Sequence, residues 1–377
     1  MPMMETYLNN PSMGPLPTWM NRHAFENVKK DYERITGYEP TPLYSLSCLA
    51  KELGLGGIYI KDESRRFGLN AFKALGTLNA VRQAAGSSLN AKKLIAATDG
   101  NFGRAVAWAA KREGMEAIIF MSSGTKPERA EAIRNMGMTK VILTGKNYDE
   151  TIHMAHEYAL KEGGLLVQDT ELPGFENIAR SVAVGYSVMP AEALSQMEEM
   201  NVQPTHVFAQ AGVGSMAGGV LGYLATAMEN QPVFGVVETW EVPCVMESAK
   251  KGEKVIIDAL PHTSMYGLNC GEPNPQTLPI LTSRASAFIR CKDEVTFEGM
   301  RRLAKPLGSD PAMVSGECGA VTLGALIRLM TDDSFRSDRE KLGLDENAHV
   351  LLFSTEGDTD PEKYERVVWG GELPTAE

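Results

Sequence analysis

Lys73 stands in a segment whose residue types could form a Schiff base. It follows Asn70, Ala71 and Phe72 and precedes a stretch of helical pattern. Apolar neighbours and the positive end of a helix both disfavour the charged ammonium and so favour the neutral, nucleophilic amine. Such an amine can react with an aldehyde. Because most lysines at a helix start are solvated, this segment alone also allows an ordinary surface lysine.

A second segment is the turn Thr98-Asp99-Gly100-Asn101-Phe102-Gly103, which follows a predicted strand. Its glycines let a ligand approach the backbone closely, and the Asn101 side chain offers both a donor and an acceptor. An Asp or Asn that caps a helix in an ordinary turn would look the same. The segment therefore predicts either a ligand-binding turn or a helix cap.

A third segment is a glycine-rich loop after the predicted strand 206–209. Its residues are Gly212, Val213, Gly214, Ser215, Gly218 and Gly219. Backbone N–H groups of such a loop, at the start of a helix, bind a phosphate group well. Tight helix packing is the alternative, and the spacing also resembles a dinucleotide fingerprint. Glu238, however, comes slightly late for the ribose contact of a nicotinamide cofactor.

The rest of the sequence predicts the elements that position these segments. Short aliphatic runs alternate with longer stretches of helical period, which is typical of a parallel sheet with crossover helices. The predicted strands are 57–61, 93–97, 117–121, 140–143, 165–168, 206–209, 233–237, 287–291 and 349–353. The predicted helices are 72–85, 102–112, 127–136, 148–161, 174–200, 215–228, 297–307 and 320–330.

Length predicts about two domains for the 377 residues. We expect a small inserted α/β domain at 67–189 and a large cofactor-binding domain formed by 1–66 and 190–377. A stretch rich in Gly, Asn and Pro at 261–279 is long enough to predict a functional loop.

Composition narrows the partners to small molecules. The hydrophobic content of 43% excludes a disordered chain, and the net charge of −11 disfavours nucleic acid and anionic membrane surfaces. No two of the five cysteines are spaced as Cys-x-x-Cys, so we expect no metal site. For Cys244 and Cys270, two free thiols are favoured over a disulfide. No apolar run is long enough for a signal peptide or a membrane span, which predicts a cytoplasmic protein.

Taken together, the lysine segment, the Asp-Gly-Asn turn and the glycine-rich loop resemble the fold type II pyridoxal-phosphate enzymes, the family of the tryptophan synthase β-subunit. The resemblance extends through 167–170, 269–275, 314–317 and 353–360. Within the family, these motifs match ammonia-lyases that act on 2,3-diaminopropionate.

The resemblance implies a two-domain α/β fold with parallel-rich twisted sheets flanked by helices, assembled as a homodimer. It implies pyridoxal 5′-phosphate as cofactor and β-elimination of D- or L-2,3-diaminopropionate to pyruvate and ammonia. A serine or threonine dehydratase of the same fold is the main alternative, and a non-catalytic ligand-binding scaffold is a lesser one.

The resemblance also implies roles for the cofactor-binding residues. Lys73 would hold the cofactor aldehyde and, once freed, act as a base at the substrate α-carbon. Asn101 would hydrogen-bond the ring oxygen, and Ser354 would face the pyridine nitrogen. The glycine-rich loop would bind the phosphate group through Gly212, Val213, Gly214, Ser215, Gly218 and Gly219.

For the substrate, the resemblance points to Asp169 and Thr170 as contacts and to Asp99 as a second base for the D isomer. Asp169 could instead be an ordinary turn residue after a strand. In one respect the chain departs from the family pattern, because Phe102 occupies the place of a histidine in the Asp-Gly-Asn turn. We expect this change to alter packing or substrate preference before it abolishes catalysis.

Overall fold

The computed structural model describes residues 2–86, 92–98, 100–122, 127–258 and 263–373. It divides into two compact units. Unit 1 comprises Met1–Ala71 and Ser187–Glu377, and unit 2 comprises Phe72–Tyr186. The sequence places the insertion at 67–189, so Lys73 belongs to the inserted unit on either boundary.

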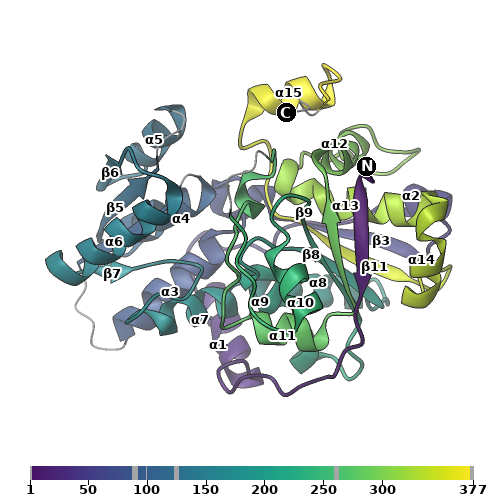
Figure 1. The fold of residues 1–377 in the computed structure, drawn as a ribbon, viewed down its shortest axis with the longest axis horizontal. Helices are drawn as coiled ribbons and strands as arrows, with labels where there is room; N and C mark the ends of the chain where they lie inside the picture. Colours follow the sequence, from purple (N-terminus) through teal and green to yellow (C-terminus); the bar gives the residue numbers. More distant parts are fainter. Residues whose placement is uncertain (1, 87–91, 99, 123–126, 259–262, 374–377) are drawn as a thin grey trace. The chain divides into compact units, whose positions relative to one another are not determined.

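Within its described residues, unit 1 contains a seven-stranded sheet (Figure 1). The strand order is β1 (Met4–Leu8), β10 (Ala287–Cys291), β9 (Val233–Thr239), β8 (His206–Gln210), β11 (His349–Ser354), β3 (Gly57–Asp62) and β2 (Leu43–Ser45). The five central strands are parallel, and β1 and β2 are antiparallel edges. The carboxyl ends of β8, β11 and β3 therefore meet at one edge of the sheet.

Helices bury both faces of this sheet, which explains why its central strands read as continuous aliphatic runs. Ile58 and Ile60 lie in one apolar cluster, whereas Tyr59 and Lys61 alternate to the opposite face. That cluster includes residues of α2 (Ser47–Leu53), α12 (Asp293–Ala304), α13 (Glu317–Thr331), α14 (Arg336–Leu342) and α15 (Pro361–Val368). The remaining helices of unit 1 are α1 (Arg22–Glu33), α8 (Val188–Glu199), α9 (Ser215–Ala227), α10 (Cys244–Lys251) and α11 (Leu278–Arg284).

Three short 3₁₀ helices complete the described part of unit 1. They are η1 (Glu63–Gly68), η2 (Tyr266–Leu268) and η3 (Asp333–Phe335). The stretch predicted as a functional loop contains η2 and reaches the start of α11, although its first residues, Pro261 and His262, lie outside the described residues.

Unit 2 is built on a smaller, fully parallel sheet. Its order is β6 (Thr139–Leu143), β5 (Glu116–Met121), β4 (Lys93–Ala97) and β7 (Leu165–Leu166). Its helices are α3 (Ala74–Gly86), α4 (Asn101–Arg112), α5 (Pro127–Arg134), α6 (Tyr148–Glu162) and α7 (Glu176–Gly185). Ile95, Phe120 and Leu166 pack against Ala155 and Ala159 of α6. The α/β fold with parallel-rich sheets predicted from the sequence is confirmed.

The prediction of one helix over 174–200 is wrong. The segment forms α7 and α8, with a break at Tyr186 and Ser187. Pro190 explains the break, because proline has no N–H to donate to the carbonyl of Tyr186 and is tolerated only in the first turn of a new helix. Ala191 N–H donates to Ser187 O at 3.1 Å as α8 begins.

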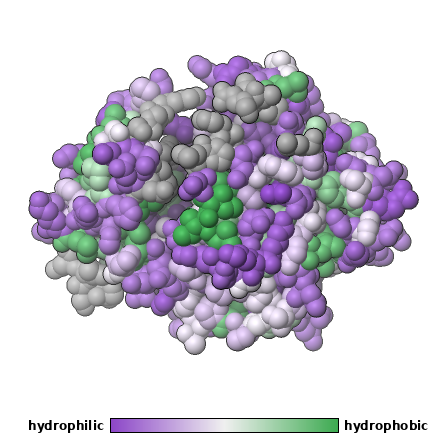
Figure 2. Space-filling model, in the orientation of Figure 1, coloured by the Kyte–Doolittle hydropathy of each residue, from purple (hydrophilic) through white to green (hydrophobic). Residues whose placement is uncertain are grey.

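Hydrophilic residues cover most of the face drawn in Figure 2, as expected for a chain that buries many of its apolar side chains. Within the part of the chain that the structure describes, no helix is both long enough and apolar enough to cross a membrane.

Candidate active site

The glycine-rich loop connects β8 to α9 in unit 1, and two of its glycines cannot be replaced without strain. Gly214 caps α9 in the left-handed conformation with φ 88°, and its carbonyl accepts the N–H of Gly218 at 2.9 Å. A Cβ on Gly218 would lie 2.5 Å from Cβ of Thr277. Glycine at these positions lets the loop turn sharply into the start of α9.

Residues of the 269–277 segment support this loop. Asn274 N–H donates to Val213 O, and its Nδ2 donates to Ser215 Oγ, both at 2.7 Å. Thr277 Oγ1 is buried and makes no hydrogen bond within the described residues. A fixed backbone at a helix N-terminus, close to an unsatisfied buried hydroxyl, fits a phosphate group.

Ser354 lies at the carboxyl end of β11, beside the strand that carries the glycine-rich loop. It is buried, and its hydroxyl donates to Ser315 Oγ at 2.8 Å. Gln210 connects the two strand ends, because its Nε2 lies 3.0 Å from Phe353 O and 2.8 Å from Thr355 Oγ1. The sequence predicted Ser354 but assigned no role to Gln210 or Ser315, whose partners are distant in the chain.

Lys73 belongs to unit 2 and sits at the start of α3, where its carbonyl accepts the N–H of Thr77 at 3.2 Å. Its Nζ donates to Asp169 Oδ2 at 2.7 Å, and both side chains are 18% exposed. The ring centroids of Phe72 and Phe102 lie 5.2 and 5.5 Å from Nζ. The structure therefore brings together the predicted lysine, the predicted substrate contact Asp169 and the unexpected Phe102.

Parallel strand ends also position Asp169. Val167 N–H donates to Ile95 O at 2.8 Å, and Gln168 Nε2 donates to Ala97 O at 3.1 Å. These bonds hold the segment after β7 against the end of β4. Thr170, the other predicted substrate contact, follows as a partly buried residue.

The Asp-Gly-Asn turn follows β4. Asn101 is the first residue of α4, and its neighbour Asp99 lies outside the described residues. A Cβ on Gly103 would lie 2.6 Å from Thr98 Cγ2 and 2.9 Å from Ile133 Cδ1. This glycine therefore allows close packing of α4, whereas a Cβ on Gly100 would have no neighbour within 4 Å among the described residues.

Tyr186 adds a buried hydroxyl to the surroundings of the lysine. Its ring centroid lies 4.8 Å from that of Phe72, and its ring fills the space beside Gly76. Burial raises the pKa of Tyr186, so the group is a neutral phenol. Its oxygen is buried without a hydrogen bond among the described residues, a feature with no signal in the sequence.

Glu238 is already used inside unit 1. Its carboxylate accepts the N–H groups of Val245 and Met246 at 2.8 Å each, at the start of α10. It is fully buried and therefore cannot serve as the ribose-binding acid of a nicotinamide site. Cys244 and Cys270 are both thiols, in line with the expectation from the sequence.

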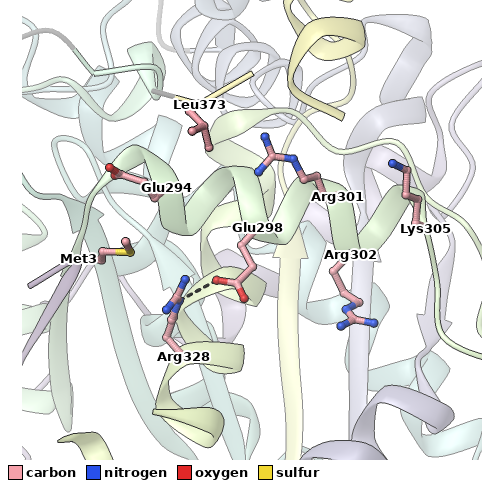
Figure 3. A pocket seen from close by; sticks show the side chains of 8 residues that line it. All are labelled: Met3, Glu294, Glu298, Arg301, Arg302, Lys305, Arg328 and Leu373. Atoms are coloured by element: carbon pink, nitrogen blue, oxygen red, sulfur yellow. Dashed lines mark hydrogen bonds and ion pairs between the residues drawn. The ribbon is translucent and has the colours of Figure 1, made fainter. Parts of the chain in front are cut away.

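A surface pocket of about 500 Å³ in unit 1 contains none of these groups (Figure 3). Its cations are bound to the protein itself: Arg328 Nε donates to Glu298 Oε2 at 2.7 Å, Arg301 Nε to Val367 O at 2.9 Å and Lys305 Nζ to Val368 O at 3.1 Å. The first of these bonds joins α13 to α12, and the other two fasten the end of α15 to the end of α12. Among the described residues, no group of three His, Cys, Asp or Glu side chains could hold a metal ion.

Comparison with known proteins agrees with this geometry. Residues 35–341 match the family described as pyridoxal-phosphate dependent enzyme. The chain is 44% identical over 367 residues to diaminopropionate ammonia-lyase of Escherichia coli (strain K12), covering 93% of this chain and 92% of the relative. It is 40% identical over 383 residues to the enzyme of that name from Salmonella typhimurium, covering 93% of each.

A solved structure shows the same likeness. It is the Escherichia coli diaminopropionate ammonia lyase in complex with an aminoacrylate-PLP azomethine reaction intermediate, with TM-score 0.91 and 41% identity. The match covers 98% of this chain and 97% of that one. With a family match that spans most of its length, the chain belongs to the pyridoxal-phosphate dependent enzymes.

Proposed function

We propose that the protein is an ammonia-lyase that uses pyridoxal 5′-phosphate to convert 2,3-diaminopropionate, as the D or L isomer, to pyruvate and ammonia. The observation that carries the proposal is the pairing of Lys73 with Asp169 in a chain that resembles diaminopropionate ammonia-lyases over nearly its whole length. The lysine supplies an amine for the cofactor aldehyde. The carboxylate supplies an acceptor for the second amine of the substrate.

The residues present fit the cofactor. The left-handed Gly214 and the close approach at Gly218 form a cradle that a Cβ would fill, and the start of α9 would hold the phosphate group there. Lys73 would hold the aldehyde, Asn101 would bind the ring oxygen and Ser354 would face the ring nitrogen. When bound, the cofactor supplies an electron sink for negative charge at the substrate α-carbon.

The chain's own residues would bind the substrate and move its proton. Asp169 would accept the β-ammonium group, with Thr170 beside it. The freed Lys73 amine would remove the α-proton, and loss of the β-amine followed by hydrolysis would release pyruvate and two ammonia molecules for each diaminopropionate and water consumed. A neutral Ser354 hydroxyl, already bonded to Ser315, would not force the ring nitrogen to stay protonated.

The test is a substrate panel with product stoichiometry. We expect both isomers of diaminopropionate to give two ammonia per pyruvate, whereas serine would give one. The matched control is Lys73→Ala, and borohydride reduction followed by peptide mapping should label Lys73. Turnover of serine or threonine without diaminopropionate would establish the dehydratase alternative. A folded, yellow, inactive protein would indicate the scaffold.

We also propose a cytoplasmic homodimer, on the family resemblance. For a subunit of 41.0 kDa, light scattering of the cofactor-loaded protein should give twice that mass. A mass of one subunit at micromolar concentration would contradict the dimer.

A further inference from the structure

The Lys73 ammonium lies close to a carboxylate and to two aromatic faces, all of which attract a cation. Asp169 Oδ2 is 2.7 Å away, and the faces of Phe72 and Phe102 lie within 5.5 Å. Both rings are buried, at 8% and 7% exposure, while the ammonium and the carboxylate stay partly accessible. An aromatic face attracts a cation within about 6 Å of its centroid, most strongly where water is scarce.

The two rings differ in what else they do. Phe72 packs against Tyr186, so its position follows from the core of unit 2. Phe102 comes from the first turn of α4, on a separate element, and the sequence motif there does not call for an aromatic hydrocarbon. The presence of an aromatic residue at position 102 is therefore not explained by the motif, and it points to a role beside the Lys73 ammonium.

We infer that Phe102 and Phe72 complete, with Asp169, a cation box for an alkylammonium group. Its occupant is the Lys73 ammonium before the cofactor is bound, and the β-ammonium of the substrate once the Lys73 nitrogen is bonded to the cofactor. The second occupant rests on the proposed function; the first does not. Phe102 is a positioning residue that makes the box selective for a cation over the neutral hydroxyl of serine.

The first experiment measures the box without substrate. Cofactor-free protein is mixed with pyridoxal 5′-phosphate across a pH series, and Schiff-base formation is followed by absorbance. Only the neutral amine reacts, so the rate of Schiff-base formation rises with pH. The midpoint of this rise reports the pKa of the Lys73 ammonium. Asp169 and the Tyr186 hydroxyl are titratable groups near the Lys73 ammonium, and both are kept in every variant.

Phe102→Leu removes the aromatic face, so the ammonium is held less firmly. We expect its midpoint to fall by about half a pH unit, which makes loading below the midpoint about three-fold faster. Phe102→Tyr keeps the face and should keep the midpoint. Phe102→Met replaces the leucine variant if that one fails to fold. The proposal of a cation box is wrong if the midpoint is unchanged in Phe102→Leu, or if Phe102→Tyr shifts it by the same amount.

The second experiment tests the substrate as occupant. The ratio of kcat/KM for diaminopropionate to that for serine should fall about two- to five-fold in Phe102→Leu and stay constant in Phe102→Tyr. An equal loss on both substrates would overturn selectivity for the β-ammonium. If the parent protein does not turn over diaminopropionate, the proposed function fails, and the loading midpoint alone decides whether the box exists.

Discussion

Two lysines of this protein bind a carboxylate at the same distance in different surroundings. Lys61 Nζ lies 2.7 Å from Glu192 Oε2 in unit 1, and Lys73 Nζ lies 2.7 Å from Asp169 Oδ2 in unit 2. Lys61 is fully buried and also donates to Thr41 O at 2.6 Å and Gln196 Oε1 at 2.8 Å. The three donors of Lys61 are thus used within the protein. Lys73 stays accessible between two rings, so its nitrogen can react.

The surroundings of Glu192 extend the contrast. Arg66 donates to Glu192 through Nη1 and Nη2 at 2.8 Å each, and Tyr38 OH donates to it at 2.6 Å. Arg66 also bonds Glu63, so every charge of the buried network has an opposite charge beside it. The network joins the segment before the insertion to α8, which follows it. The Glu192 carboxylate is enclosed by several donors, whereas the Asp169 side chain is still 18% exposed.

The largest expected effect is on Lys73→Ala. Without the reactive amine, turnover should fall by at least roughly a thousand-fold while the protein still folds, because alanine suits a helix start. Turnover within tenfold of the parent would contradict the assignment. Lys61→Met is the matched contrast, and we expect it to lower stability while turnover per folded molecule is retained.

The next largest effect is expected for Glu192→Gln. This substitution leaves Lys61 and Arg66 buried with one carboxylate fewer. The free energy of unfolding should fall by about 3–5 kcal/mol. Equilibrium denaturation in urea measures the loss. Glu199→Gln on the exposed part of the same helix is the control and should change stability by less than about 0.5 kcal/mol. Equal effects in the two variants would show that the network does not stabilise the fold.

The contrast explains which features could be predicted from the sequence. The signal for Lys73 is local: apolar neighbours, a helix start and a motif within a few residues. The glycine-rich loop is recognisable for the same reason. The side-chain partners of Lys61, Glu192 and Gln196, lie on α8, which follows the inserted unit in the sequence. No local pattern therefore indicates that this lysine is buried and that Lys73 is accessible.

The fold divides in the same way. The central parallel strands are recognisable because burial on both faces demands continuous aliphatic residues. The edge strands β1 and β2 were missed because they are short and carry polar residues such as Glu5, Thr6 and Ser45. The pairing of β1 also depends on a strand far away in the chain, since Met4 pairs with Cys291, whereas β2 pairs with the next strand, β3.

A smaller effect is expected in acid. Burial by itself would raise the pKa of Glu192, but Arg66 and Lys61 lower it to about 2. Because the ordinary value is 4.5, the stabilisation is complete above that pH and is lost as the pH falls toward 2. The stability difference between the parent and Glu192→Gln should therefore be constant at neutral pH and shrink below about pH 4.5. A difference that persists unchanged at pH 3 would contradict the low pKa.

The smallest expected effect concerns Asp99. If Asp99 acts as a second base beside Lys73, the accessible lysine belongs to a reactive site with two bases, in contrast to the buried Lys61. One base approaches the substrate α-carbon from one side and can remove the proton of only one isomer. If Lys73 serves the L isomer, an enzyme that uses both isomers needs another base for the D isomer, and Asp99 is the residue that the family resemblance implies. A carboxylate with an ordinary pKa near ~3.9 is a weak base, so a closed site must exclude water to strengthen it.

Asp99→Asn should therefore lower kcat/KM for D-2,3-diaminopropionate by about ten-fold or more and spare a larger share of activity on the L isomer. Steady-state kinetics on the two isomers measures this. Equal losses would reassign Asp99 to positioning the cofactor or substrate. Full retention of activity on the D isomer would exclude Asp99 as its base, and the search for that base would then turn to other groups near Lys73, with the Tyr186 hydroxyl first because it is buried beside the lysine without a hydrogen bond among the described residues.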